Sequence, residues 1–268
     1  MAWVRLLPLL LVITLAACGR EATRPDAPPD VDRAPAVPRD VANIPDAVPR
    51  AEPRSAYGNR SPYTVLGRTY SVLPTAKGYK ERGIASWYGE KFHGRLTSNR
   101  EPYDMYGMTA AHKTLPLPTY ARVTSLDNGR SVVLRINDRG PFHENRIIDL
   151  SYAAAVKLGI QARGTGLVEV EALDPEHPDL ATLPPPPELE PHQLYVQVGA
   201  YGSRDNARAM ADRLEGLCFR DVFLDRVHIG RELLHRVRIG PLDGVEDADR
   251  IITELARAGL HGIRTTID

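Results

Sequence analysis

The sequence predicts a mixed fold with two modules, a compact and mostly β barrel followed by a small α+β domain of the order βαββαβ. Residues 83–173 contain several short alternating segments and one short helical segment, which is typical of a small barrel. Residues 192–268 contain the same strand, glycine turn and amphipathic helix twice. Proline, with 23 residues, concentrates in two stretches without periodicity, which predicts that Pro-rich linkers precede and separate the modules.

The first module is expected to be built from short strands. Asp127-Asn128-Gly129 lies between two alternating segments and is a hairpin signal. A short helix is expected from Ser151 to Leu158, since Ser151 suits an N-cap and Gly159 a C-cap. The expected strands are 84–88, 120–126, 131–136 and 167–173.

The second module shows its internal repeat clearly. Tyr195–Tyr201 leads into a helical segment at 203–214, and His235–Leu242 leads into another at 246–255. A strand-like segment follows each helix. This order predicts a four-stranded antiparallel sheet with both helices on one face, which leaves the other face free to bind a ligand.

The N-terminus has the features of an export signal, namely Arg5 followed by an apolar run from Leu6 to Ala17. Twelve helical residues rise about 18 Å, which is too short for a permanent membrane span. The run ends in Leu15-Ala16-Ala17-Cys18, which matches the bacterial lipobox and predicts lipidation of Cys18. Gly19 follows instead of the Asp that favours inner-membrane retention, which points to the outer membrane.

These patterns divide the chain into five segments. Residues 1–17 are expected to be a lipoprotein signal peptide and residues 18–82 a disordered Pro-rich tether, because the latter lack the apolar periodicity of a folded core. Residues 83–173 form the first module. Residues 174–191, which include Pro184–Pro187, form a stiff linker, and residues 192–268 form the second module.

Composition excludes some classes of function. Lys+Arg and Asp+Glu are equal at 34 each, so the chain has no basic footprint of the kind that nucleic-acid binding requires. Its two cysteines, Cys18 and Cys218, have no zinc-site spacing, and no metal or other cofactor is expected. The apolar neighbours of Cys218 predict that it is buried.

Two carboxylates of the first module are candidates for acid–base chemistry. Asp138 follows an apolar strand and precedes a Gly-Pro turn, where partial burial would suit a general acid. Cleavage of a glycosidic bond needs such an acid together with stabilisation of oxocarbenium-like charge. Spacing alone favours a structural interpretation over catalysis, in which Asp138 pairs with Arg139 or Arg135 and Glu101 caps a loop.

These residues also carry a resemblance. The first module resembles the double-psi β-barrel of the rare lipoprotein A (RlpA) family, and the second resembles a SPOR (sporulation-related repeat) domain. The barrel motifs are Gly83–Gly89, Phe92–Arg95, Glu101–Met105, Thr109–Pro116 and Asn137–Phe142, and the SPOR motifs are Val196–Tyr201 and Asn206-Ala207. Arg100 departs from the family pattern, which has Gly before the Glu.

The resemblance implies a septal lytic transglycosylase that cleaves peptidoglycan between N-acetylmuramic acid and N-acetylglucosamine and leaves 1,6-anhydro ends. Asp138 would act as the acid and then the base. Glu101 and Asp104 would stabilise charge at C1 or orient the sugar, and the imidazole of His112 would bond a carboxylate. Tyr88 and Tyr103 would either stack on sugar faces or pack in the core.

For the second module, the resemblance implies binding of denuded glycan, which has lost its stem peptides, through Gln197 and Tyr201 on the free sheet face. The implied location is the periplasmic side of the outer membrane, enriched at the septum, with divisome proteins as further partners. The sheet topology also resembles an RNA-binding fold, but the export signal and the absent RNP motif argue against RNA. Two alternatives stay open, a lipoprotein that only binds the cell wall and a glycan hydrolase that uses water.

Overall fold

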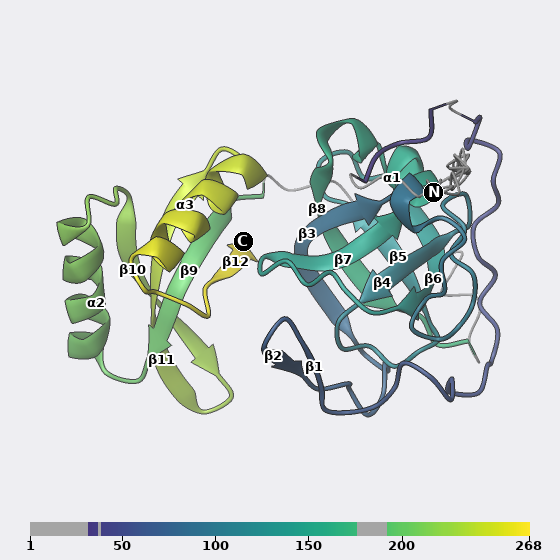
Figure 1. The fold of residues 1–268 in the computed structure, drawn as a ribbon. Helices are drawn as coiled ribbons and strands as arrows, with labels where there is room; N and C mark the ends of the chain where they lie inside the picture. The colour runs from purple at the N-terminus through teal and green to yellow at the C-terminus, as the bar shows by residue number, and fades with distance from the viewer. Residues whose placement is uncertain (1–31, 37–38, 176–191) are drawn as a thin grey trace, which may run out of the picture.

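The computed structural model describes residues 32–36, 39–175 and 192–268, which form a barrel domain and a smaller C-terminal domain (Figure 1). The barrel is closed in the strand order β3-β7-β4-β6-β5-β8, with parallel pairing of β3 with β7 and of β4 with β6. Its strands are β3 (Lys80–Tyr88), β4 (Thr109–His112), β5 (Thr119–Ser125), β6 (Ser131–Asp138), β7 (Arg146–Ser151) and β8 (Thr165–Ala172). The predicted barrel is therefore confirmed.

Local sequence signals produce two elements of the barrel directly. Strands β5 and β6 pair antiparallel around the 126–130 turn, in which Gly129 has φ of +72°. Helix α1 (Tyr152–Leu158) starts where the side chain of Ser151 accepts a bond from the Ala154 N–H, and it ends at Gly159 in the left-handed region. Both predictions are confirmed. Two 3-10 turns, Glu90–Phe92 and Gln161–Arg163, complete the described helices of this domain.

An N-terminal strap, defined here as residues 32–36 and 39–79, lies against the barrel. It contains the hairpin of β1 (Tyr63–Val65) and β2 (Arg68–Tyr70), and Figure 1 shows it passing around the barrel. Val41 is only 3% exposed and belongs to the barrel core. The expectation of a disordered tether is wrong for these residues. They lack the apolar periodicity of a folded core, and hydrogen bonds to the barrel hold them in place instead.

The strap is bonded to the barrel along its length. The carboxylate of Asp32 accepts from the Gly89 N–H at 2.9 Å, and the carboxylate of Asp46 accepts from the Val133 N–H at 2.7 Å. Asn59 exchanges two bonds with the backbone of Leu117, at 2.7 and 2.8 Å. These contacts satisfy backbone groups on both sides, so the strap is part of the barrel domain.

The C-terminal domain has the predicted βαββαβ order. Its sheet is antiparallel throughout, in the order β10-β11-β9-β12. Apolar residues of both helices share one core cluster with Val196, Val237 and Ile239, so both helices cover the same face. The elements are β9 (Leu194–Tyr201), α2 (Arg204–Gly216), β10 (Val222–Ile229), β11 (Glu232–Leu242), α3 (Val245–Arg257) and β12 (Arg264–Ile267).

The two domains touch where β12 lies against β3 and α3 lies against β8. The Asp249 carboxylate accepts from Arg146 Nη2 at 2.7 Å and from the side-chain amide of Asn145.

Cys218 is exposed, which contradicts its predicted burial, because it follows α2 at a left-handed position (φ +66°). The predicted signal peptide, Cys18 and most of the 174–191 linker lie outside the described residues. None of the described helices is long and apolar enough to span a membrane.

Candidate active site

Asp138, at the end of β6, is held by three donors on a single oxygen. Its Oδ1 accepts from Ser98 N–H at 2.8 Å, from Ser98 Oγ at 2.6 Å and from the Arg139 N–H at 2.7 Å. No donor from the described residues is bonded to Oδ2. Because Oδ1 is saturated as an acceptor, a proton on this carboxyl group would sit on Oδ2. The bonding therefore fixes which oxygen is available for proton exchange.

Glu101 is bonded to two residues of β6, the strand that ends at Asp138. Its Oε2 accepts from Arg135 Nη1 at 2.7 Å and from the Asn137 amide at 2.9 Å, while 43% of its side chain stays exposed. Burial raises the pKa of Glu101, but the hydrogen bonds from Arg135 and Asn137 outweigh it, and the pKa lies below its usual value. Glu101 is therefore a fixed, accessible negative charge.

The strap contributes Glu52 to the same network. Glu52 accepts from Arg135 Nη2 at 2.8 Å, from Arg135 Nε at 3.0 Å and from the Tyr120 hydroxyl at 2.6 Å. The bonds from Arg135 are the main reason that the pKa of Glu52 falls to about 2, against the smaller opposing effect of burial. Arg135 is thus fixed between two carboxylates, and no local sequence pattern indicates this link across 83 residues.

A hollow of about 440 Å³ adjoins Asp138, and the strap forms part of its wall. Tyr63 and Phe142 line it, with ring centroids 6.5 Å apart, and Tyr70 stacks on Tyr63 at 5.4 Å. Aromatic rings suit the apolar faces of sugars. Tyr63 was not predicted as a site residue, because residues 18–82 show no apolar periodicity. The signal that this stretch does carry is its set of tyrosines, namely Tyr57, Tyr63, Tyr70 and Tyr79.

Arg100, which stands where the family pattern has Gly, lies in the lining of this hollow. It adopts φ of +74°, the left-handed conformation that Gly accepts freely, and its guanidinium stacks over the strap's Tyr57 at 5.5 Å. This conformation costs a residue with a Cβ roughly 1–2 kcal/mol. The loop therefore keeps the geometry that a Gly would have, and Glu101 is held in place despite the substitution.

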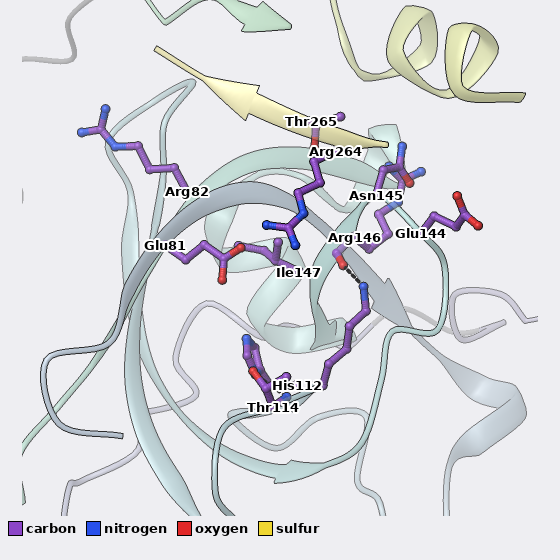
Figure 2. A pocket seen from close by; sticks show the side chains of 11 residues that line it. Glu81, Arg82, His112, Thr114, Glu144, Asn145, Arg146, Ile147, Arg264 and Thr265 are labelled. Atoms are coloured by element: carbon purple, nitrogen blue, oxygen red, sulfur yellow. Dashed lines mark hydrogen bonds between the residues drawn. The ribbon is translucent and has the colours of Figure 1, made fainter. Parts of the chain in front are cut away.

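His112 lies in a different hollow, which Figure 2 shows. Its imidazole is 3% exposed, Nδ1 accepts from the Leu115 N–H at 3.0 Å, and Nε2 meets the Tyr79 hydroxyl at 2.9 Å. Burial, with the nearby charges of Arg139 and Lys113, lowers the pKa of His112 to about 3. The imidazole is neutral at pH 7, and the expected direct bond to a carboxylate is wrong.

His112 still touches the site through its backbone. Its carbonyl accepts from Arg139 Nη1 at 3.0 Å, and Arg139 follows Asp138 in the chain. The Tyr79 hydroxyl in turn donates to Glu81 at 2.5 Å, so a carboxylate lies one step beyond the imidazole. In Figure 2, Arg264 of β12 points into this hollow from the C-terminal domain.

Asp104 lies on the surface, with its side chain 62% exposed. It accepts from the Tyr106 N–H at 2.9 Å, and its Oδ1 is 3.7 Å from His93 Nδ1. Of the four predicted catalytic residues, only Asp138 lines the hollow; Glu101, Asp104 and His112 lie outside its lining. Glu101 is linked to the strand that ends at Asp138 through Arg135 and Asn137. Among the described residues, no group of three or more His, Cys, Asp or Glu is arranged to hold a metal ion.

Tyr88 and Tyr103 belong to the core. They are 7% and 3% exposed and stack on each other with centroids 4.0 Å apart. Burial is the main reason that the pKa of each hydroxyl is raised. Of the two interpretations of these rings, packing is confirmed.

In the C-terminal domain, Gln197 and Tyr201 lie on opposite faces of the sheet. A bulge separates the two register pairs Gln197–Arg238 and Gly199–Val237. The Tyr201 ring covers Gly199 and packs against the helix-side core, so its predicted place on the free face is wrong. Gln197 lies on the face where Arg238 contacts the Tyr195 ring at 4.1 Å.

A closed barrel with crossed parallel pairs, joined to a βαββαβ sheet, defines a double-psi β-barrel protein with a C-terminal SPOR domain. Residues 80–171 match the family described as Lytic transglycolase, and residues 191–266 match the SPOR domain.

Two relatives identify the family. RlpA of Pseudomonas aeruginosa strain UCBPP-PA14, an endolytic peptidoglycan transglycosylase by name, is 40% identical over 87% of this chain and 83% of its own. The protein of the same name from Vibrio cholerae is 42% identical over 94% and 92%. The chain belongs to the RlpA family. The crystal structure of the P. aeruginosa RlpA SPOR domain is 32% identical over 27% of this chain and 96% of that chain, with a TM-score of 0.26.

Proposed function

We propose that this protein is a peptidoglycan lytic transglycosylase that cleaves glycan strands at their N-acetylmuramic acid residues and leaves 1,6-anhydro ends. The observation that carries the proposal is the Asp138 carboxyl group, fixed by three donors on Oδ1 beside a hollow with aromatic walls. Membership of the RlpA family supports the same activity, because the relatives are named for it.

In the proposed reaction, protonated Asp138 donates from Oδ2 to the O4 oxygen of the leaving N-acetylglucosamine as the C1–O4 bond breaks. The C6 hydroxyl of the same muramic acid residue then attacks C1, and Asp138 takes its proton. One C–O bond breaks and one forms within the glycan, and Asp138 ends protonated as it began. The fixed charge of Glu101 stabilises positive charge at C1. Asp104 orients the sugar from the rim.

The products distinguish this reaction from its alternatives. The chain without residues 1–18, incubated with denuded glycan, should release fragments whose muramic acid ends are one water lighter than hydrolysed ends, measured by mass spectrometry. Reducing muramic acid ends would identify a hydrolase instead. If neither denuded nor peptide-bearing glycan is cleaved, the protein only binds the wall.

Location is proposed to depend on two separate parts of the chain. Cys18 carries a lipid that anchors the protein to the outer membrane, facing the periplasm, and the SPOR domain binds denuded glycan at the septum through Gln197. Divisome proteins are proposed as further partners at that place. The lipobox and the SPOR match support these assignments.

In cells that express a fluorescent fusion of the full chain, Cys18→Ala should move the protein from the outer-membrane fraction to the soluble periplasm. Gln197→Ala should keep the membrane fractionation and weaken the band at midcell. The exposed Arg208, on α2, supplies the control variant Arg208→Ala, which should change neither readout. A Cys18→Ala protein that stays with the outer membrane would contradict the anchor, and an unchanged midcell band would contradict the role of Gln197.

A further inference from the structure

The His112 imidazole is bonded at both ring nitrogens, and these bonds require one protonation state. Nδ1 accepts from the backbone N–H of Thr114 at 3.2 Å and from that of Leu115 at 3.0 Å, so Nδ1 must carry a lone pair. Burial keeps the pKa of His112 far below its usual value, so the ring is neutral at pH 7. The single proton of the neutral imidazole therefore sits on Nε2.

Tyr79, at the end of the strap, supplies the acceptor that this tautomer needs. With the proton on Nε2, His112 donates to the Tyr79 hydroxyl across 2.9 Å, and that hydroxyl donates in turn to Glu81 at 2.5 Å. The two rings also meet edge to face, with centroids 5.2 Å apart. Figure 2 shows Glu81 and His112 in the lining of the same hollow. The direction of the bonds is thus defined from His112 through Tyr79 to Glu81.

The tautomer matters because the 112–115 turn holds Arg139. The carbonyls of His112 and Leu115 both accept from Arg139 Nη1, at 3.0 and 2.6 Å. Burial lowers the pKa of Arg139 to about 10, so its charge depends on such carbonyls in place of water. A proton on Nδ1 would face the N–H groups that Nδ1 now accepts from, and the turn would lose the bonds that close it.

Arg139 in turn fixes the carboxyl group of Asp138. Its backbone N–H donates to Asp138 Oδ1 at 2.7 Å and to Ser98 Oγ at 3.1 Å. A side chain anchored to the 112–115 turn restrains the peptide from which this N–H points. Because a displacement of about 1 Å can slow a reaction by about 10²-fold, a change in the turn can affect Asp138 without a contact between the imidazole and the substrate.

We propose that Tyr79 is a positioning residue that holds His112 in the Nε2–H tautomer and thereby keeps Asp138 in place. Glu81 orients the Tyr79 hydroxyl for this role. The hydroxyl acts at a distance, since Tyr79 lies outside the lining of the hollow beside Asp138. The inference rests on the proposed function for the role of Asp138, whereas the tautomer is a property of the folded protein alone.

Tyr79→Phe removes the hydroxyl and keeps the ring, which leaves the Nε2 proton of His112 without its acceptor. The tautomer is measured by nitrogen NMR at pH 7 on the isotope-labelled chain without residues 1–18, and the His112 signal is the one that His112→Asn lacks. Wild type should carry the proton on Nε2 alone, and Tyr79→Phe should show a mixture of both tautomers. The backbone amide resonances of Ser98 and Arg139 should shift in this variant.

The kinetic readout is release of 1,6-anhydro ends from denuded glycan. Tyr79→Phe should lower kcat about tenfold and leave KM within about twofold, since the lining of the hollow beside Asp138 keeps all its residues. The matched control is Tyr152→Phe, which removes a hydroxyl from a core tyrosine packed against Trp87. This variant should change neither kcat nor the His112 tautomer.

Coupling between the two residues identifies the route. An Asn at position 112 can accept from the N–H groups two and three residues further on, and it has no tautomers. In the His112→Asn background, Tyr79→Phe should therefore change kcat by no more than about twofold and should no longer shift the Arg139 amide. A full tenfold loss or an undiminished shift in that background would show that Tyr79 acts by another route.

A wild-type proton on Nδ1, or an unchanged tautomer or kcat in Tyr79→Phe, would also overturn the proposal. The NMR readout does not need cleavage. If wild type cleaves no glycan, the proposed function fails, and the tautomer and the Arg139 amide still decide whether Tyr79 positions the Asp138 loop. If wild type cleaves glycan and Tyr79→Phe matches it in rate and tautomer, the proposed function stands and the role of Tyr79 is removed.

Discussion

Asp138→Asn should eliminate detectable glycan cleavage while the protein stays folded. A positioned acid contributes about 10² to 10⁴-fold to the rate, and an amide neither donates an acidic proton nor takes one back. The Asn can orient its carbonyl oxygen toward the three donors that now bind Oδ1, so the loop at Ser98 should keep its place. The measurement is release of 1,6-anhydro ends from denuded glycan, together with the thermal unfolding midpoint.

The matched control is Asp212→Asn, on the exposed face of α2, which changes charge equally and should leave the rate unchanged. Activity of Asp138→Asn within about tenfold of wild type would assign the acid to another group, because a general acid contributes more than that. Glu101 would then be examined first, although its bonds from Arg135 and Asn137 favour the ionised form.

Glu52→Gln should lower kcat roughly ten- to a hundredfold, although this residue lies outside the hollow, because small misplacements of catalytic groups have effects of that size. Glu52 and Glu101 bind the same guanidinium, that of Arg135. With Glu52 neutral, Arg135 is drawn toward Glu101, which shifts and further neutralises the charge that faces C1. KM should change less than kcat, since the hollow's lining stays intact.

Arg50 supplies the control for this substitution. It bonds Glu52 at 3.2 Å from the exposed side, with 74% of its side chain in solvent, so Arg50→Gln should leave kcat within about twofold. If Glu52→Gln retains wild-type kcat, Glu52 is not a positioning residue.

Glu52 should also add stability above pH of about 4.5. That stability should be lost as the pH falls toward 2, because the folded-state pKa of Glu52 is depressed.

The sequence was sufficient where structure follows from local chemistry. The 127–129 turn, the Ser151 cap and the Gly159 end each depend on residues within one turn of themselves. The helical repeats of the C-terminal domain follow from apolar spacing in the same way. Family motifs also grouped Glu101 with Asp138, and in the structure Glu101 bonds Arg135 and Asn137 of the strand that ends at Asp138.

The remaining features depend on distant contacts or on single-residue changes of register. The strap is ordered by pairs such as Glu52 with Arg135, which no local pattern reveals. Tyr201 changes faces because one extra residue in β9 reverses the alternation of side chains. The environment of His112 depends on Tyr79, which reaches it from the end of the strap. The errors at the strap and at His112 came from partners that are remote in the sequence, and the error at Tyr201 came from a local bulge.

If Cys18 carries the proposed lipid, the strap also limits how far from this anchor the enzyme can work. If residues 18–82 were free, the barrel could reach about 220 Å from a lipid on Cys18. Because the chain is attached to the barrel from Asp32 onward, the stretch between lipid and barrel can extend no more than about 50 Å, whatever its conformation. Cleavage would then be confined to the layer of the wall nearest the outer membrane, and lengthening this stretch would widen the zone of digestion.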